Sequence, residues 1–134
     1  MDNLTPVQRR RTMAAVKSQD TTIEIAVRSV VHRLGFRFRL HRVDLPGNPD
    51  LAFPRYRAVI FVHGCFWHGH NCRRGRRVPA TNRVYWVDKV ARNVARDRRV
   101  RRALKLAGWR SLVIWECEIP SRRLGDRIRR FLDG

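Results

Sequence analysis

Residues 59–72 read VIFVHGCFWHGHNC, an apolar run followed directly by two cysteines and three histidines. The apolar run predicts a buried strand over residues 57–62. Packing alone does not require so much cysteine and histidine in the residues that follow. Two thiolates and an imidazole are three of the four ligands of a closed tetrahedral zinc site, and Cys117, the third cysteine of the chain, is available as the fourth. We therefore expect a strand that leads into a zinc-ordered loop.

The zinc site competes with a simpler interpretation of the cysteines, in which they pack as small hydrophobic side chains. Zinc would use all three cysteines, and it would attach the loop to a distant strand end and order it. A loop of this length needs such a reason to be rigid. The spacing does not indicate which histidine supplies the nitrogen ligand: His63, His68 or His70.

Helical and strand patterns alternate on both sides of this loop, with no repeat and no break that marks a second domain. Residues 5–8, TPVQ, open a basic helix to about Lys17, and residues 21–24, TTIE, open a second helix that Gly35 ends. The apolar stripe of the second helix is Ile23, Val27, Val30, Val31 and Leu34. The other predicted elements are strands over 36–40, 50–53 and 111–115, the last of them buried, a hairpin turn through Pro54 and Arg55, and helices over 83–107 and 122–132. This order predicts a single α/β domain with a central mixed sheet flanked by helices.

Composition points to a polyanionic partner. The chain has 134 residues, of which 43% are hydrophobic, enough for one core. Thirty Lys+Arg residues against eleven Asp+Glu give a formal charge of +19, which favours nucleic acid. The lysines are only Lys17, Lys89 and Lys105, so an arginine-rich coding bias would explain arginine over lysine but not the shortage of acids. A membrane surface is the weaker interpretation, because the basic helices lack a bulky apolar face.

The compartment follows from two further observations. The sequence has no apolar run long enough to span a bilayer and no signal peptide. We therefore expect a cytoplasmic protein, in which cysteines bind metal more often than they form disulfides.

Asp50 is the second candidate for chemistry. It begins an apolar strand, where aspartate is rare, and the paired strand delivers His63 at its end, so a hairpin could place a carboxylate beside an imidazole. Hydrolysis of a phosphodiester needs a cation to neutralise the phosphate oxygens and a base to activate water. Asp50 could hold Mg²⁺ and a nearby histidine could act as the base. An equally compatible interpretation is that Asp50 caps the turn over residues 46–49.

Six blocks in order along nearly the whole chain carry a family resemblance. They are residues 20–24 (DTTIE), 45–50 (LPGNPD), 59–68 (VIFVHGCFWH), 79–81 (PAT), the spaced set Trp86, Lys89, Asn93 and Asp97, and residues 115–117 (WEC). Any one block is weak, but their joint occurrence resembles the very-short-patch repair (Vsr) DNA mismatch endonucleases. The resemblance implies a type II restriction-endonuclease-like fold. It also implies a nick in one strand beside a T:G mismatch left by deamination of 5-methylcytosine.

The resemblance also implies roles for individual residues. Asp50 corresponds to the side-chain ligand of a catalytic Mg²⁺, and Val62 would add its main-chain carbonyl. His68 corresponds to the general base, His63 would assist at the scissile phosphate, and Glu24 would support metal-bound water. The structural Zn²⁺ ligands that the resemblance implies are Cys65, His70, Cys72 and Cys117.

DNA contacts follow from the same resemblance. Phe66, Trp67 and Trp86 correspond to a wedge that enters the base stack beside the mismatch, and Met13, on an N-terminal helix within residues 1–19, would grip the minor groove. A wobble pair stacks less well than its neighbours, so opening it costs less, and base-to-aromatic stacking returns roughly 1–3 kcal/mol per base. Alternatively Trp86 belongs to the core face of its helix. The residues that already supply this face are Val87, Val90, Ala91 and Val94.

Some features depart from the family pattern, and two other functions remain open. Val62 stands where threonine is common, Asn71 replaces a frequent histidine, and the chain ends soon after its last helix, so recognition contacts are expected to differ. The alternatives are a module that marks mismatches without cutting and a restriction-type nuclease that cuts matched duplex. We expect a monomer in the bacterial cytoplasm, at the nucleoid, linked to a cytosine methyltransferase, a repair polymerase and a ligase.

Overall fold

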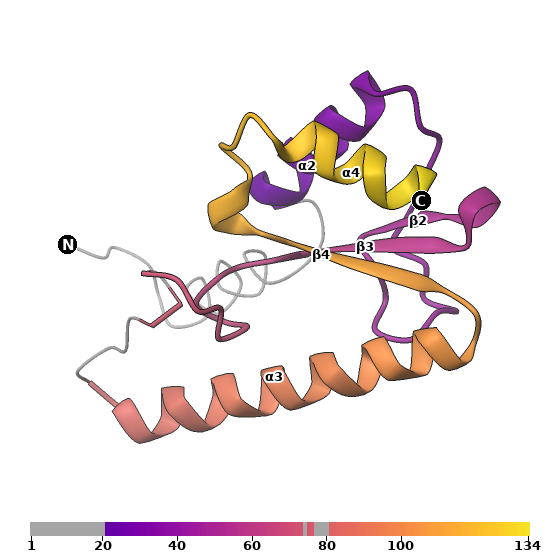
Figure 1. The fold of residues 1–134 in the computed structure, drawn as a ribbon. Helices are drawn as coiled ribbons and strands as arrows, with labels where there is room; N and C mark the ends of the chain where they lie inside the picture. Colours follow the sequence, from indigo (N-terminus) through magenta and orange to yellow (C-terminus); the bar gives the residue numbers. More distant parts are fainter. Residues whose placement is uncertain (1–20, 74, 77–80) are drawn as a thin grey trace, which may run out of the picture.

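A four-stranded mixed sheet lies between helices in the computed structural model, which describes residues 21–73, 75–76 and 81–134 (Figure 1). The strands are β1 (Arg39–Leu40), β2 (Leu51–Phe53), β3 (Ala58–His63) and β4 (Arg110–Trp115). They lie in the order β1-β2-β3-β4; the first two pairings are antiparallel and β3 pairs with β4 in parallel. This confirms the predicted mixed sheet. The predicted basic helix at residues 5–17, with Met13, lies outside the described residues.

Helix α2 (Thr22–Arg33) forms as its sequence predicts. The side chain of Thr21 caps it by accepting a hydrogen bond from the amide of Glu24 at 3.3 Å. Val27 and Val31 are fully buried, and the other three residues of the apolar stripe pack against the same core. The helix ends before Gly35, which has a φ of +87°, a conformation that glycine adopts without strain.

Strand β3 divides the hydrophobic core in two, because its side chains alternate between the faces of the sheet. Ala58, Ile60 and Val62 face α2 and the last helix, α4 (Leu124–Asp133). Val59 and Phe61 face the long helix α3 (Arg83–Leu106). Since all six residues of β3 are buried, this strand is the centre of the molecule. The alternation directs His63, its last residue, to the α3 side.

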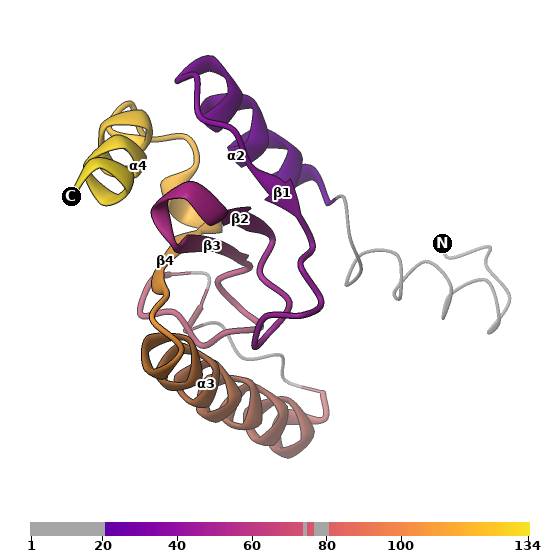
Figure 2. The ribbon, with the colours of Figure 1, turned by 90° about the vertical axis from the view of Figure 1, so that its right-hand side faces the viewer.

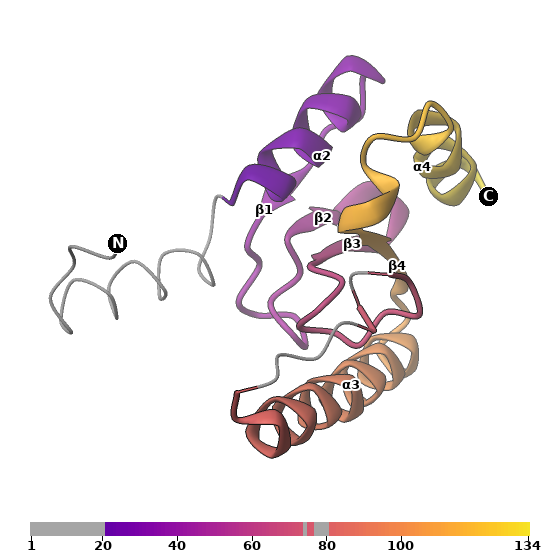
Figure 3. The same cartoon turned by 90° about the vertical axis from the view of Figure 1, so that its left-hand side faces the viewer.

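The helices cover opposite faces of the sheet. Figure 2 and Figure 3 show α2 and α4 on one side of it and α3 on the other. Helix α4 contributes Leu124, Ile128 and Leu132 to the first core, and α3 contributes Leu104 to the second. The two faces of the sheet are therefore covered by separate helical layers.

No helix in the described ranges is both long enough and apolar enough to cross a bilayer.

Three sequence predictions need correction. The strand expected over residues 36–40 is reduced to its last two residues, because Phe36 and Phe38 pack into the first core without pairing. Strand β4 is a half-buried edge strand in which only Ile114 is fully buried. On α3, Val87 and Ala91 are exposed, so they do not form the core face. The N-terminal part of α3 runs past the sheet, as Figure 1 shows, and has only the loop after β3 to cover.

Candidate active site

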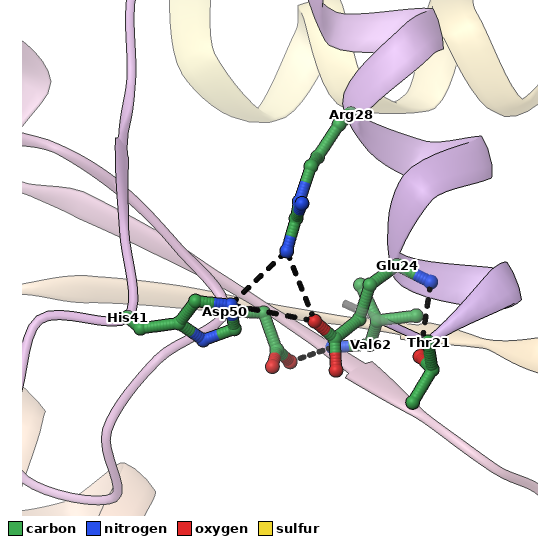
Figure 4. A network of polar contacts seen from close by, with 6 residues as sticks. All are labelled: Thr21, Glu24, Arg28, His41, Asp50 and Val62. Carbon is green, nitrogen blue, oxygen red and sulfur yellow. Dashed lines mark hydrogen bonds and ion pairs between the residues drawn. The ribbon is translucent and has the colours of Figure 1, made fainter. Parts of the chain in front are cut away.

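Two carboxylates meet where β2 begins and β3 ends (Figure 4). Asp50 directly precedes β2, and its Oδ2 accepts a hydrogen bond from the amide of Val62 at 2.6 Å. Glu24, in the first turn of α2, is only 6% exposed. The interpretation of Asp50 as a plain turn cap therefore fails to describe its main contact, which reaches across the hairpin to β3.

This arrangement is electrostatically suited to a cation. Burial raises the pKa of Asp50 to about 6, and the charge of Glu24 adds to the shift, while the hydrogen bond from Val62 opposes it. The ligand atoms of Asp50, Glu24 and His41 all lie within 4.8 Å of one another. The buried carboxylate of Glu24 and the half-buried carboxylate of Asp50 supply the hard oxygen donors that Mg²⁺ binds, so the donor set fits a divalent cation.

Sequence reasoning missed two members of this cluster, Arg28 and His41. The guanidinium Nη2 of Arg28 donates to Oε2 of Glu24 at 3.2 Å and lies 3.0 Å from Nε2 of His41, as Figure 4 shows. His41 has a φ of +50° in the loop after β1, and nothing in its flanking sequence marks it. Arg28 follows Glu24 by one helical turn, a spacing that could have indicated the ion pair.

The second half of the site is a pair of stacked imidazoles. His63, at the end of β3, and His68, in the following loop, have ring centroids 3.7 Å apart and planes inclined by 4°. The ring of Trp115, at the end of β4, meets His63 edge-on at 5.4 Å. Burial lowers the pKa of His63 to about 3, and the adjacent His68 imidazole adds to this effect. His63 is therefore neutral at physiological pH.

Asp97 of α3 orients His68, and the sequence prediction gave it no role. Nδ1–H of His68 donates to Oδ2 of Asp97 at 2.6 Å. Burial alone would raise the pKa of Asp97, but the hydrogen bond and charge of His68, with the charges around them, hold it below its usual value. Asp97 lies on the same face of α3 as Trp86 and Asn93. An acidic residue on this inward face was the sequence signal that could have indicated a role in the site.

Helix α3 also fixes the backbone of the loop. The side-chain amide of Asn93 donates to the carbonyl of Trp67 at 2.9 Å. Gly69 has a φ of +62°, and a Cβ there would lie 2.9 Å from Val94 and 3.1 Å from Val90. The loop is thus pressed against the helix at the position that follows His68.

The four predicted zinc ligands come together beside this loop. The ligand atoms of Cys65, His70, Cys72 and Cys117 lie within 4.8 Å of one another, and Sγ of Cys117 is 3.5 Å from Nδ1 of His70. The ring of His70 stacks on Trp115 at 4.1 Å, and Cys65 is fully buried. Because three cysteine sulfurs and an imidazole converge from the loop and from the end of β4, the donor set fits a tetrahedral Zn²⁺.

The predicted wedge residues form one aromatic cluster. Trp86 lies 5.9 Å from Phe66 and 5.2 Å from Trp67 between ring centroids, in edge-to-face geometry. The ammonium of Lys89 lies 5.2 Å from the ring centroid of Trp67. The adjacent Tyr85 is 51% exposed and packs edge-on against Trp86. Trp86 therefore contacts the loop and not the hydrophobic core.

Comparisons with known proteins agree with this geometry. A family model described as DNA mismatch endonuclease Vsr matches residues 1–74. The chain is 51% identical to the type II nicking enzyme V.XorIIP of Xanthomonas oryzae pv. oryzae, across 98% of this chain and 97% of that protein. It is 44% identical to the DNA mismatch endonuclease Vsr of Escherichia coli, across 94% and 84% of the two chains. It is 33% identical to the type II nicking enzyme V.NmeAIP of Neisseria meningitidis, across 98% and 94%.

Proposed function

Because the chain belongs to the Vsr family of DNA mismatch endonucleases, we propose that it nicks one strand of duplex DNA beside a T:G mismatch left by deamination of 5-methylcytosine. The reaction is hydrolysis of a phosphodiester bond, and repair synthesis would then restore C:G. The +19 charge supports a DNA substrate, since each neutralised phosphate releases counterions.

One observation carries the proposal. The end of β3 brings the Asp50 and Glu24 carboxylates and the His63, His68 and Asp97 cluster to the same place, because Val62 contacts Asp50 and the next residue begins the histidine stack. A cation site and a general base are what phosphodiester hydrolysis requires. A module that only binds DNA has no need of both at one strand end.

The geometry suggests a separate role for each of these residues. Since Nδ1–H of His68 is donated to Asp97, the free Nε2 of His68 is left to take a proton from the attacking water. His63 is neutral, so it would assist at the scissile phosphate by hydrogen bonding and not by charge. Asp50, with the main-chain carbonyl of Val62, would hold Mg²⁺, and Glu24 would orient water around it. When bound, Mg²⁺ would supply charge neutralisation of the phosphate oxygens.

A structural zinc ion completes the proposal. Cys65, His70, Cys72 and Cys117 would bind Zn²⁺ and join the loop to the end of β4. Burial raises the pKa of the Cys65 thiol to about 12, and a zinc ligand must be a thiolate. The protein would therefore release protons as it takes up zinc, and the bound ion would order the loop that carries His68.

Phe66, Trp67 and Trp86 would form the wedge that unstacks the mismatched pair. Their cluster lies on the loop that carries His68, and Lys89 places a cation beside it, suited to a neighbouring phosphate. Unstacking costs a few kcal/mol, and stacking of a base on an aromatic ring returns about 1–3 kcal/mol. A mismatch lowers the cost of unstacking, so the wedge would favour T:G over a matched pair.

The remaining parts of the proposal rest on family membership. The mixed sheet would belong to the type II restriction-endonuclease-like fold, with residues 20–134 as the catalytic core and residues 1–19, with Met13, as the arm that grips the minor groove. The protein would act as a monomer in the bacterial cytoplasm. It would follow a cytosine methyltransferase, whose product it repairs, and precede a polymerase and a ligase.

The direct test compares two duplexes that differ only at one pair, T:G or C:G. The expected result with Mg²⁺ is one nick beside the T:G pair and little cleavage of the C:G duplex. Equal rates on both would identify a restriction-type nuclease instead. Asp50→Ala should abolish nicking and leave binding of the T:G duplex largely intact, whereas undiminished cleavage by that variant would reject the proposed metal site.

A further inference from the structure

The carboxylate of Asp97 and the Nδ1 atoms of both stacked histidines converge on one side of the catalytic imidazoles. Oδ2 of Asp97 is 2.6 Å from Nδ1 of His68 and 4.0 Å from Nδ1 of His63. The three ligand atoms all lie within 4.8 Å of one another. This side of the rings is not the side proposed to act on water, because the Nδ1 of His68 is already committed to Asp97.

His63 is incompletely satisfied in this arrangement. His63 is 7% exposed, and its Nδ1 is buried without a hydrogen-bond partner among the residues that the structure describes. Buried polar atoms are nearly always paired, so an orphan of this kind calls for an explanation such as an ion or an ordered water. Nδ1 of His63 faces the Asp97 carboxylate, so a hydrogen-bond or metal partner for this nitrogen would lie between the three side chains.

The spacing of the three atoms is close to that of a coordination site. Zn²⁺ binds imidazole nitrogen at about 2.0–2.1 Å and carboxylate oxygen at about 2.0–2.2 Å, which places tetrahedral ligand atoms roughly 3.2–3.5 Å apart. The observed 2.6 and 4.0 Å separations lie on either side of this range. Three ligand positions would be completed by changes of less than about 1 Å in these two separations together with rotation of the rings out of their parallel stack, because a metal lies in the plane of each imidazole that binds it.

We propose that His63, His68 and Asp97 form an inhibitory binding site for Zn²⁺ or a similar transition-metal ion, separate from the carboxylate site of Asp50. Two imidazoles and one carboxylate suit transition metals, whereas Mg²⁺ prefers oxygen donors. Binding forms a bond from the metal to Nδ1 of His68 and releases the proton of that nitrogen to solvent. Metal binding at this cluster goes beyond the proposed function, and its inhibitory effect rests on the proposed role of His68 as the base.

The surroundings give access to the ion and limit its affinity. A cavity of about 210 Å³ adjoins the three residues and can admit the ion and a water as its fourth ligand. The cavity is also lined by Arg98 and Arg101, whose charges oppose a dication. The site therefore suits reversible inhibition better than permanent occupancy.

The expected consequence is loss of nicking. A metal on Nδ1 of His68 removes the hydrogen bond by which Asp97 orients the ring, and it withdraws electron density from Nε2, so His68 becomes a poor base. Because this ion is held by different atoms from those that would hold Mg²⁺, excess Mg²⁺ should not restore activity.

The test is a count of bound zinc per chain after equilibration of the full-length protein in buffered micromolar Zn²⁺. Wild-type protein should bind one more zinc than His63→Asn and than Asp97→Asn, while the Cys-rich site contributes equally to all three. His32→Asn, at an exposed position on α2, is the matched control and should keep the wild-type count, while His41→Asn reports on zinc at the carboxylate cluster. If His63→Asn fails to fold, Asp97→Asn makes the same comparison at a helical position whose side chain is 16% exposed.

Two results would overturn the proposal. One is a wild-type zinc count in both His63→Asn and Asp97→Asn, and the other is loss of the additional zinc in His41→Asn alone, which would place the ion at the carboxylate site. A second readout is ¹⁵N NMR of labelled histidine. Zn²⁺ should shift Nδ1 of His63 and His68 and Mg²⁺ should not, whereas unshifted Nδ1 resonances at saturating Zn²⁺ would also reject the site.

Discussion

Asp97 holds His68 by a 2.6 Å hydrogen bond from the imidazole Nδ1 to the carboxylate, and so joins the middle of α3 to the loop that follows β3. The bond sets the tautomer of His68 and points its other nitrogen away from the helix. Stacking on His63 alone restricts the plane of the ring but does not choose between its two nitrogens. The helix thus turns a loop residue into a group with one orientation.

Asp97→Asn should slow nicking by about 10²- to 10⁴-fold, because the amide cannot stabilise the imidazolium and favours the wrong tautomer. Single-turnover cleavage of a T:G duplex would measure the effect. Asp88→Asn, at an exposed position on the same helix, is the matched control and should cut at the wild-type rate. A wild-type rate for Asp97→Asn would show that His68 does not depend on this carboxylate.

Asp50→Asn should stabilise the protein in Mg²⁺-free buffer while it abolishes nicking. The pKa of Asp50 is raised to about 6 in the folded state, so the folded protein binds this proton more tightly than the unfolded chain does. The stability that protonation provides is therefore lost as the pH rises through about 6. Above that pH the variant should gain about 3 kcal/mol in free energy of unfolding, and the gain should shrink toward pH 4.

Urea unfolding from pH 4 to 8 would measure this difference. Asp44→Asn is the control with the opposite sign, because its hydrogen bond with Arg42 lowers the pKa of Asp44. That variant should gain no stability at high pH. If the free energies of unfolding of Asp50→Asn and wild type differed by the same amount at every pH, ionisation of the Asp50 carboxylate would not be what destabilises the folded state.

Cys117→Ser should lower bound zinc and the melting temperature together, by on the order of 10 °C, because the ion binds only the folded arrangement. Atomic emission and calorimetry would give the two values. Arg122→Ala, a nearby exposed substitution, should change neither. Full zinc content in Cys117→Ser would show that the fourth ligand lies elsewhere.

Trp86→Ala should weaken binding of the T:G duplex by about 10- to 100-fold, which corresponds to about 1–3 kcal/mol of stacking. It should weaken C:G binding much less, so the preference between the two duplexes would shrink. Fluorescence anisotropy with Val84→Ala as the control would test this, because Val84 is 75% exposed in the same turn. An equal loss on both duplexes would assign Trp86 a backbone role only.

The sequence predicted those parts of the fold that depend on local pattern. The Thr21 cap, the apolar stripe of α2 and the buried strand β3 are each encoded by neighbouring residues, and the structure has them all. The place of Asp50 at the start of β2 was also predictable, and its carboxylate accepts a hydrogen bond from the amide of Val62, the residue before His63.

The sequence did not predict contacts that depend on how distant elements pack. The prediction gave the core face of α3 to Val87 and Ala91, but the sheet does not extend far enough to cover them. Asp97 and His41 reach the site from a helix and a loop whose approach is set by tertiary packing. His41 has no local signal that separates it from ordinary surface residues, and for Asp97 the available signal was its place on the same face of α3 as Trp86 and Asn93.

Helix α3 also acts as a rigid spacer of fixed length. Asp97 follows Trp86 by about three helical turns, so both side chains lie on one face, about 16 Å apart along the axis. Inserting one alanine between them would turn one end by about 100° relative to the other without removing any functional group. In such a variant the aromatic cluster and the oriented His68 could no longer engage the same duplex together, and the distance from the disturbed base pair to the cut would no longer be defined.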